Sequence, residues 1–174
     1  MNKLLLFSMS FFFLLGCKKN GFDVNNPDVD LFVSQLKSGS YNEREVGDDG
    51  KPLWLKMPRF GHKHVARLIE LSKDTARIEK FPTNPISSRR PHPEGRDYFI
   101  LGECLLAVVE IIREKGWLDP YLIDTSKDIP ERFKGVTGVE ILMISDQYRQ
   151  WWSNYKDGDW KGNNPLANTP YKWM

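Results

Sequence analysis

The chain has 174 residues, with 25 basic side chains against 23 acidic ones and only two cysteines. A net charge of +2 provides no overall field that would recruit nucleic acid or an anionic membrane, so nucleic-acid binding is disfavoured. Without residues 1–16, which are considered next, 158 of the 174 residues remain. This is the size of a single domain with a real hydrophobic core.

The N-terminal segment has the form of a secretory signal peptide. Lys3 precedes an almost entirely apolar run over residues 4–15, which is shorter than the roughly 20 residues that a membrane-spanning helix needs. Leu14-Leu15-Gly16-Cys17 resembles the lipobox, in which the cysteine receives diacylglycerol before cleavage and is N-acylated afterwards. We expect residues 1–16 to be the signal peptide and Cys17 to be lipidated, with palmitate among its acyl chains. The alternative is an ordinary secretory signal with a chance cysteine.

The residues around Cys17 also indicate a location. Several acyl chains give lasting membrane attachment, because each methylene buried in the bilayer adds roughly 0.8 kcal/mol to the free energy of binding. The residue after Cys17 is Lys18 and not the aspartate that keeps many enteric lipoproteins in the inner membrane. An outer-membrane anchor that faces the periplasm is therefore expected, with surface exposure as the alternative. Residues 17–25 are expected to be a short tether and residues 26–174 a single helical domain.

The first helix is predicted between Asn26 and Gly39. Asn26-Pro27-Asp28 offers an N-cap, a proline at the first helical position and an acid in the first turn. The apolar residues that follow recur at helical spacing and predict a buried stripe. Its members are Val29, Phe32, Val33 and Leu36.

A hairpin, a second helix and a loop are predicted next. Gly47-Asp48-Asp49-Gly50 is a turn between Glu45-Val46 and Leu53-Trp54-Leu55, which can pair as a small β-hairpin. Apolar residues at helical spacing predict a short helix over residues 62–72. Residues 81–93 contain four prolines and therefore form a loop.

Residues 98–115 are the most apolar segment of the mature chain and predict a helix in the middle of the domain. Cys104 lies in this segment and is expected to be a buried free thiol, because Cys17 is committed to lipid. We interpret the few polar positions as a solvated edge, so that Glu103→Ala should cost little. These positions are Glu103, Ala107, Glu110 and Glu114.

A fourth helix is predicted from about Val139 to Tyr155, with Trp152 at the edge of its buried stripe. The stripe consists of Ile141, Ile144, Tyr148, Trp151 and Tyr155. The tail, residues 157–174, is expected to be irregular with its aromatic side chains packed back on the helices. The predicted fold is therefore mainly all-α, a compact four-helix domain with long proline- and glycine-rich loops and one small hairpin.

Four segments of the chain resemble a family of bacterial envelope lipoproteins that is described only as a domain of unknown function. They are Asp28-Val29-Asp30-Leu31-Phe32-Val33-Ser34-Gln35-Leu36-Lys37-Ser38-Gly39, Phe81-Pro82-Thr83-Asn84-Pro85-Ile86-Ser87-Ser88, Leu101-Gly102-Glu103-Cys104-Leu105-Leu106 and Tyr148-Arg149-Gln150-Trp151-Trp152. The resemblance implies a small helical protein related to the helix pairs of HEAT or armadillo repeats. It supplies no catalytic or ligand residues.

The candidates for chemistry are few, and neither a metal nor a cofactor is predicted. His62 and His64 are two residues apart, whereas two metal ligands on one helix face are usually four apart, so we interpret them and His92 as surface histidines. Glu103 and Glu110 lie two helical turns apart, about 10 Å. This is close to the spacing of paired carboxylates in glycoside hydrolysis, although a solvated edge is the preferred interpretation.

Two further groups are candidate binding residues. Arg89 and Arg90 could grip a carboxylate or phosphate in a bidentate way, although no phosphate-cradling glycine pattern accompanies them. Trp160, Tyr171 and Trp173 could stack on sugar rings or anchor a protein interface.

These observations lead to three hypotheses of function. The first is a lipid-anchored, non-catalytic module that binds another envelope component, either protein or glycan. The second is a polysaccharide-binding accessory lipoprotein, and the third is an envelope glycan hydrolase that uses Glu103 or Glu110. The membrane, through Cys17, is the expected partner in all three.

Overall fold

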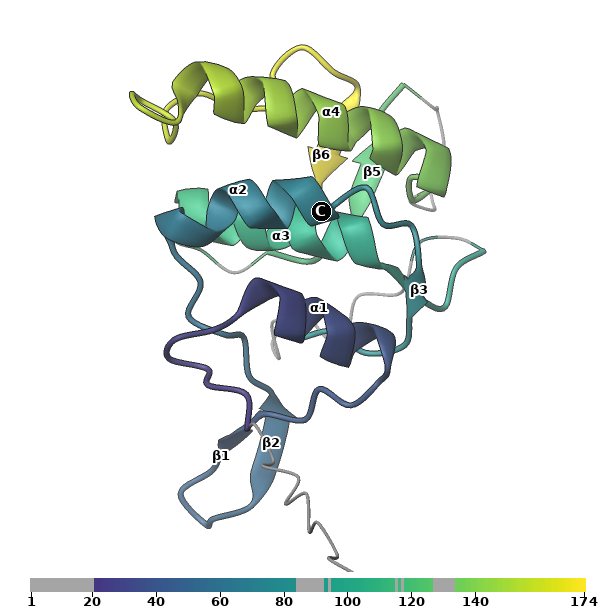
Figure 1. The fold of residues 1–174 in the computed structure, drawn as a ribbon. Coiled ribbons are helices and arrows are strands. Elements are labelled where there is room, and N and C mark those ends of the chain that lie inside the picture. Colours follow the sequence, from purple (N-terminus) through teal and green to yellow (C-terminus); the bar gives the residue numbers. More distant parts are fainter. Residues whose placement is uncertain (1–20, 84–92, 94, 115, 117, 127–133) are drawn as a thin grey trace, which may run out of the picture.

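Four helices and six short strands make up the described part of the computed structural model, which covers residues 21–83, 93, 95–114, 116, 118–126 and 134–174. Helices α2 (His62–Leu71) and α3 (Leu101–Glu114) lie side by side in the middle of the protein (Figure 1). Helix α4 (Gly138–Tyr155) covers this pair on one side, and α1 (Val29–Lys37) lies on the other.

The strands form three separate two-stranded antiparallel sheets. Strands β1 (Arg44–Val46) and β2 (Pro52–Leu55) make the predicted hairpin, which extends from the end of the protein near α1 (Figure 1). The other two sheets join segments that are distant in sequence. Strand β3 (Arg77–Ile78) pairs with β4 (Phe99–Ile100), and β5 (Leu122–Asp124) pairs with β6 (Tyr171–Trp173).

The expectation of a mainly all-α fold with HEAT- or armadillo-like helix pairs is therefore wrong, because the described residues form three small sheets besides the helices and much of the remainder is loop. The four helices lie close to their predicted positions. The missed strands contain two or three residues each, which is too short for an alternation of apolar and polar residues to be recognised. Their partners are also distant in sequence, so no turn signal marks them.

Helix α1 begins two residues later than Pro27, because Asp28 is its N-cap. The Asp28 carboxylate accepts a hydrogen bond of 2.9 Å from the backbone N–H of Leu31. The predicted stripe is confirmed, since Val29, Phe32, Val33 and Leu36 are all buried. These side chains contribute to one hydrophobic core that extends in sequence from Phe22 to Leu166.

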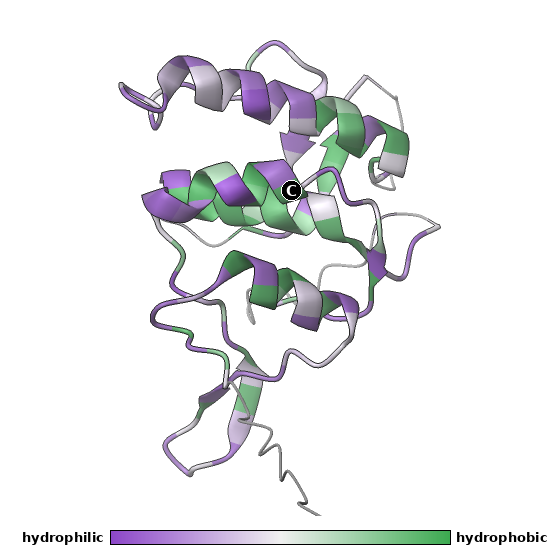
Figure 2. Cartoon of the chain, viewed as in Figure 1, coloured by the Kyte–Doolittle hydropathy of each residue, from purple (hydrophilic) through white to green (hydrophobic). Residues whose placement is uncertain are grey.

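Helix α3 is the centre of this core. Every residue from Leu101 to Glu110 is buried, and Figure 2 shows that α3 is largely apolar. Cys104 is a fully buried free thiol, as predicted, and burial raises its pKa well above the usual value for cysteine. A thiol held in this environment is an inert core group.

Gly102 allows α3 to lie directly against the end of α2. A Cβ atom at this position would be 2.0 Å from the backbone oxygen of Ser72 and 2.9 Å from the Ile141 side chain. We predict that Gly102→Ala lowers the free energy of unfolding by about 1–3 kcal/mol or more, because a backbone atom would have to move. Urea unfolding would measure this loss. Gly158→Ala is the matched control, and equal losses for the two variants would contradict the close approach.

Helix α4 begins with a capping box, in which Thr137 Oγ1 accepts from the Glu140 N–H and the Glu140 carboxylate accepts from the Thr137 N–H. Most of the predicted stripe is confirmed, because Ile141, Ile144, Tyr148 and Trp151 are buried. Tyr155 is 38% exposed and does not belong to it. Trp152 is half-buried, as expected for the edge of the stripe.

Candidate functional site

The two glutamates that we considered for catalysis lie inside the protein. Glu103 has no exposed surface, and Glu110 is 3% exposed. The interpretation of these residues as a solvated edge of α3 is therefore wrong. Helical spacing separates polar from apolar faces, but it does not distinguish a face turned to water from a face turned to a buried partner. The expected tolerance of Glu103→Ala loses its basis as well.

Glu103 forms a buried ion pair with Arg96, a residue of the segment that leads into β4. Arg96 Nη2 and Glu103 Oε2 are 2.8 Å apart, and the two side chains are 6% and 0% exposed. The other carboxylate oxygen, Oε1, accepts a hydrogen bond of 2.6 Å from the N–H of Leu122 in β5. Arg96 also donates to the backbone oxygen of Val136 and lies over the Tyr121 ring. The pair thus joins α3 to both flanking loops.

The surroundings of Glu103 change its acidity. Burial raises its pKa to about 7, although the positive charge of Arg96 and the hydrogen bond from Leu122 act in the opposite direction. Among the described residues, Glu103 Oε2 and Arg96 Nε and Nη2 have no hydrogen-bond partner, so the contact between them is ionic. Removing only one member of such a buried ion pair strongly destabilises the folded protein, because the other charge stays buried without a partner.

A small hollow lies beside Arg96, between the segment before β4 and the start of α4. Its volume is about 220 Å³, and Arg96, Tyr98, Lys134, Gly135 and Thr137 contribute to its walls. A second hollow of about 230 Å³ lies between the end of α1 and β3. Both are smaller than the roughly 300–1,000 Å³ of most small-molecule sites. Neither Glu103 nor Glu110 lines either of these two hollows.

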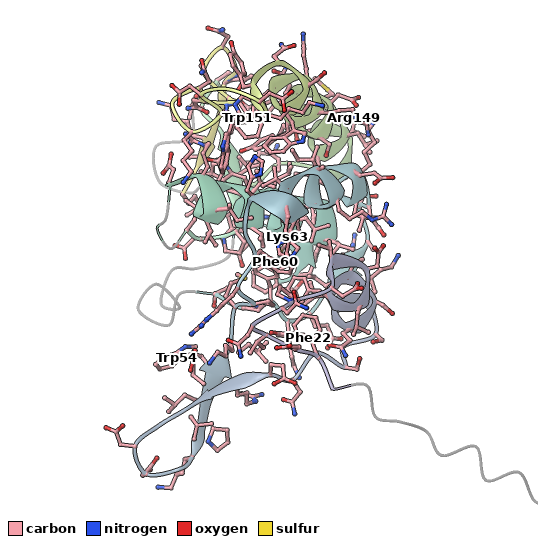
Figure 3. All side chains as sticks on the ribbon, turned by 60° about the vertical axis from the view of Figure 1, so that its left-hand side comes forward. Phe22, Trp54, Phe60, Lys63, Arg149 and Trp151 are labelled. Carbon is pink, nitrogen blue, oxygen red and sulfur yellow. The ribbon has the colours of Figure 1, made fainter. Side chains whose placement is uncertain are left out.

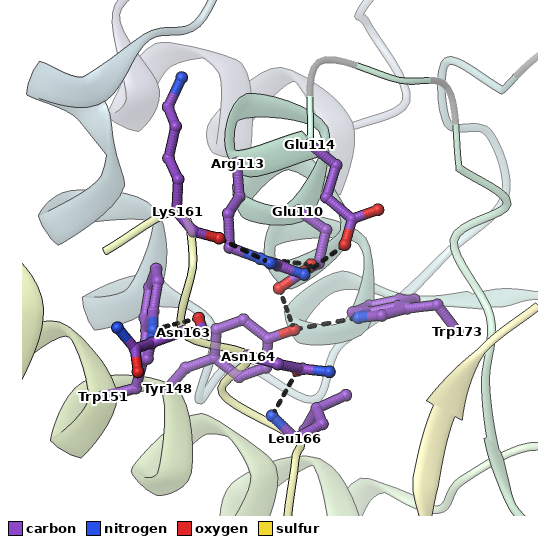
Figure 4. A network of polar contacts seen from close by, with 10 residues as sticks. All are labelled: Glu110, Arg113, Glu114, Tyr148, Trp151, Lys161, Asn163, Asn164, Leu166 and Trp173. Carbon is purple, nitrogen blue, oxygen red and sulfur yellow. Dashed lines mark hydrogen bonds and ion pairs between the residues drawn. The ribbon is translucent and has the colours of Figure 1, made fainter. Parts of the chain in front are cut away.

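Glu110 belongs to a second polar network, which ties the C-terminal segment to α3 and α4 (Figure 4). Its Oε1 accepts a hydrogen bond of 2.7 Å from the Tyr148 hydroxyl, which in turn accepts one of 3.0 Å from Trp173 Nε1. Its Oε2 accepts two hydrogen bonds from Arg113, of 2.6 and 2.9 Å. Arg113 also donates to the backbone oxygen of Lys161 and pairs with Glu114. Glu110 therefore has a structural function, because it fixes the position of the tail.

This arrangement does not favour glycoside hydrolysis. A pair of hydrolytic carboxylates needs open space on both sides of a sugar ring, with one of them free to act as the general acid. Glu103 and Glu110 instead point to separate partners, Arg96 for one and Arg113 with Tyr148 for the other. Their oxygens are taken up by contacts within the protein.

The two described histidines lie at the start of α2 and behave differently. His62 is exposed, as expected, and its ring packs against Trp152 and Trp160 at centroid distances of 5.1 Å. His64 is buried, which corrects its interpretation as a surface residue. Its Nδ1 accepts a hydrogen bond of 2.9 Å from the Gly61 N–H and so caps the helix. Among the described residues, no group of three or more His, Cys, Asp or Glu could hold a metal ion.

The C-terminal aromatic residues do not form one platform. Trp160 packs edge-on against Trp151 and Trp152, with Lys161 over its ring. Tyr171 and Trp173 instead belong to β6, and the Trp173 indole is used in the Tyr148 network. Trp160 therefore belongs to a half-buried surface cluster with Trp152 and His62, which we call the tryptophan cluster.

Several candidate residues lie outside the described part of the chain. They are Cys17, Arg89, Arg90 and His92. Sequence reasoning also missed Arg96, Arg113 and Tyr148 as partners of the buried acids. The signal that could have found them is the presence of Glu103 within an apolar helix, because a buried carboxylate requires a cation or hydrogen-bond donors nearby.

Comparison with known proteins places the chain in a family. The family model described as Domain of unknown function (DUF4943) matches residues 23–174, and the chain belongs to this family. This result confirms the resemblance to a domain of unknown function. No curated protein and no solved structure matches the chain. In the part of the chain that the structure describes, no helix has the length and apolar content needed to cross a membrane.

Proposed function

We propose that the protein is a lipid-anchored, non-catalytic envelope lipoprotein whose folded domain binds another envelope component. The observation that carries this proposal is the short stretch of chain between Cys17 and the core. Phe22 is only 7% exposed and packs against Phe32 and Tyr41, with ring centroids 5.9 and 5.3 Å apart. Lipid on Cys17 would therefore hold the domain close to the membrane surface.

The buried acids support the non-catalytic part of the proposal. Glu103 and Glu110, the only carboxylates we considered for hydrolysis, connect α3 to loops and to the tail.

The outer face of α4 is the surface that best fits a partner. Val139, Leu142 and Met143 are 71%, 40% and 56% exposed, and their spacing places them on one face of the helix. Figure 2 shows that this N-terminal half of α4 is the more apolar one. Large apolar side chains that cluster on a surface are typical of protein interfaces, so we propose an envelope protein as the partner.

Polysaccharide binding remains the second candidate, and the tryptophan cluster favours it. Trp152 and Trp160 are half-buried and meet edge-on at 5.8 Å, with His62 against both rings. Aromatic faces of this kind can stack on sugar rings. Loss of retention on a glycan column in Trp160→Ala, with unchanged thermal stability, would favour this candidate over a protein partner.

The anchor itself predicts the behaviour of Cys17→Ala. This variant should remain as an uncleaved or soluble precursor and should incorporate no labelled palmitate, because Cys17 is the proposed site of acylation. Metabolic labelling and fractionation of the envelope would measure both effects. Cys104→Ala is the matched control, which should be labelled and fractionate as the wild type does. Palmitate that still enters Cys17→Ala would disprove the lipobox interpretation.

A further inference from the structure

We propose that the β1–β2 hairpin contacts the lipid surface to which Cys17 is anchored. This inference rests on the proposed function, since it needs the lipid on Cys17. The hairpin carries three large apolar side chains that are exposed to a substantial fraction. Val46, Leu53 and Trp54 are 63%, 39% and 41% exposed.

The hairpin and the point where the described chain begins lie at the same end of the protein. Figure 3 shows Phe22 and Trp54 at this end and Trp151 and Arg149 at the opposite one. Contacts at the base of the hairpin explain this arrangement. The Phe22 ring packs on Tyr41, whose hydroxyl donates to the backbone oxygen of Lys56, directly after β2. The Arg59 N–H donates to the backbone oxygen of Val24.

The chain between Cys17 and the core is short, and this places the hairpin end of the protein next to the membrane. Four residue steps separate Cys17 from Gly21, the first described residue, and they span at most about 14 Å when fully extended. An acylated Cys17 sits at the lipid–water interface, so this end of the domain must lie within that distance of the headgroups. The hairpin that carries Val46, Leu53 and Trp54 then lies at the membrane rather than in open water.

The chemistry of the hairpin fits an interfacial contact. Tryptophan is enriched at membrane interfaces, because its ring is largely apolar and its N–H can remain hydrated. Residues 44–56 contain three basic and three acidic side chains, so they have no net charge. Two ion pairs, Lys51–Asp49 at 2.9 Å and Lys56–Glu45 at 3.2 Å, hold four of these charges together. The contact should therefore depend on the apolar side chains and not on anionic lipid.

The test uses the mature lipoprotein, purified in detergent and reconstituted into phosphatidylcholine vesicles. Trp54→Cys is labelled with an environment-sensitive fluorophore, and Val139→Cys is the matched control, since Val139 is also exposed and belongs to α4, which lies at the opposite end of the protein from the hairpin (Figure 1). Acylated Cys17 and buried Cys104 leave the introduced cysteine as the reactive thiol. Val46→Cys replaces Trp54→Cys if the latter fails to fold.

The expected result is a blue-shifted emission at position 54 that nitroxide-labelled phospholipid quenches and aqueous iodide does not. The label at position 139 should show the reverse. Replacing a third of the phosphatidylcholine by phosphatidylglycerol should change neither result. A protein that floats with the vesicles but keeps a water-exposed label at position 54 overturns the hairpin contact and leaves the anchor intact. A wild-type protein that does not float contradicts the anchor, and the hairpin contact falls with it.

Discussion

Arg96→Met is expected to lower the free energy of unfolding by about 3–5 kcal/mol at pH 8, because it leaves the Glu103 carboxylate buried without a counter-charge. Glu103 has no exposed surface, and its Oε2 lies 2.8 Å from Arg96 Nη2. Methionine fills much of the volume of the arginine stem, so the loss reports the charge rather than a cavity. Urea unfolding at pH 8 measures it.

The loss should be much smaller at pH 5. The pKa of Glu103 in the folded protein is raised from 4.5 to about 7, so the folded state favours the protonated form. Stability that depends on this proton is fully present below pH 4.5 and is lost as the pH rises towards 7. Removal of the Arg96 charge raises the pKa further. At pH 5 the Glu103 carboxyl is neutral in the folded variant and needs no cation.

A second substitution isolates the ion pair from other effects. Adding Glu103→Gln to Arg96→Met should restore most of the lost stability at pH 8, whereas Glu103→Gln alone should be destabilising, because it leaves the Arg96 charge buried. If Arg96→Met lost the same stability at pH 5 and pH 8, the Glu103 carboxylate would not be the group that needs the cation.

Trp151→Ala is expected to cost about 3–5 kcal/mol, the usual range for removal of a large buried aromatic side chain. Trp151 is 4% exposed, lies edge-on to Tyr148 at 6.0 Å and donates from Nε1 to the backbone oxygen of Asn163 at 2.8 Å. The substitution thus removes core volume and a link between α4 and the tail. Denaturant unfolding, with the slope checked for two-state behaviour, measures the loss.

Trp160→Ala is the control for this prediction. Trp160 is half-buried and packs on the outside of Trp151, at a centroid distance of 6.3 Å, so its removal should cost clearly less. A Trp151→Ala variant that stays fully stable but no longer binds its partner would contradict the structural interpretation. It would make this part of α4 the binding face.

Local signals in the sequence predicted most of the helical structure. Each of these signals depends on residues that are close in sequence: the apolar stripe of α1, the glycine and aspartate residues of the hairpin turn, and the long apolar run of α3. The buried Cys104 followed from the same run. The N-cap of α1 was misplaced, since Asp28 rather than Asn26 accepts the hydrogen bond from Leu31, and Tyr155 was wrongly included in the buried stripe of α4.

Contacts between distant segments could not be read in this way. Strand β6 pairs with β5, with Leu122 opposite Trp173, and these residues are about fifty positions apart. Whether Glu103 and Glu110 face water depended on where Arg96, Tyr148 and Trp173 would lie. The sequence pattern identified the two acids as candidate site residues, but it predicted that they face solvent, whereas both are buried.

The most direct test of the lipid anchor is the mass of the N-terminal peptide of the mature protein. Cleavage before Asp23 releases residues 17–22, which include only one cysteine. We expect a peptide that begins at Cys17 and carries diacylglycerol on its thiol and a further acyl chain on its amino group. A peptide that begins elsewhere, or one with an unmodified Cys17, would contradict the lipid anchor and the membrane contact derived from it.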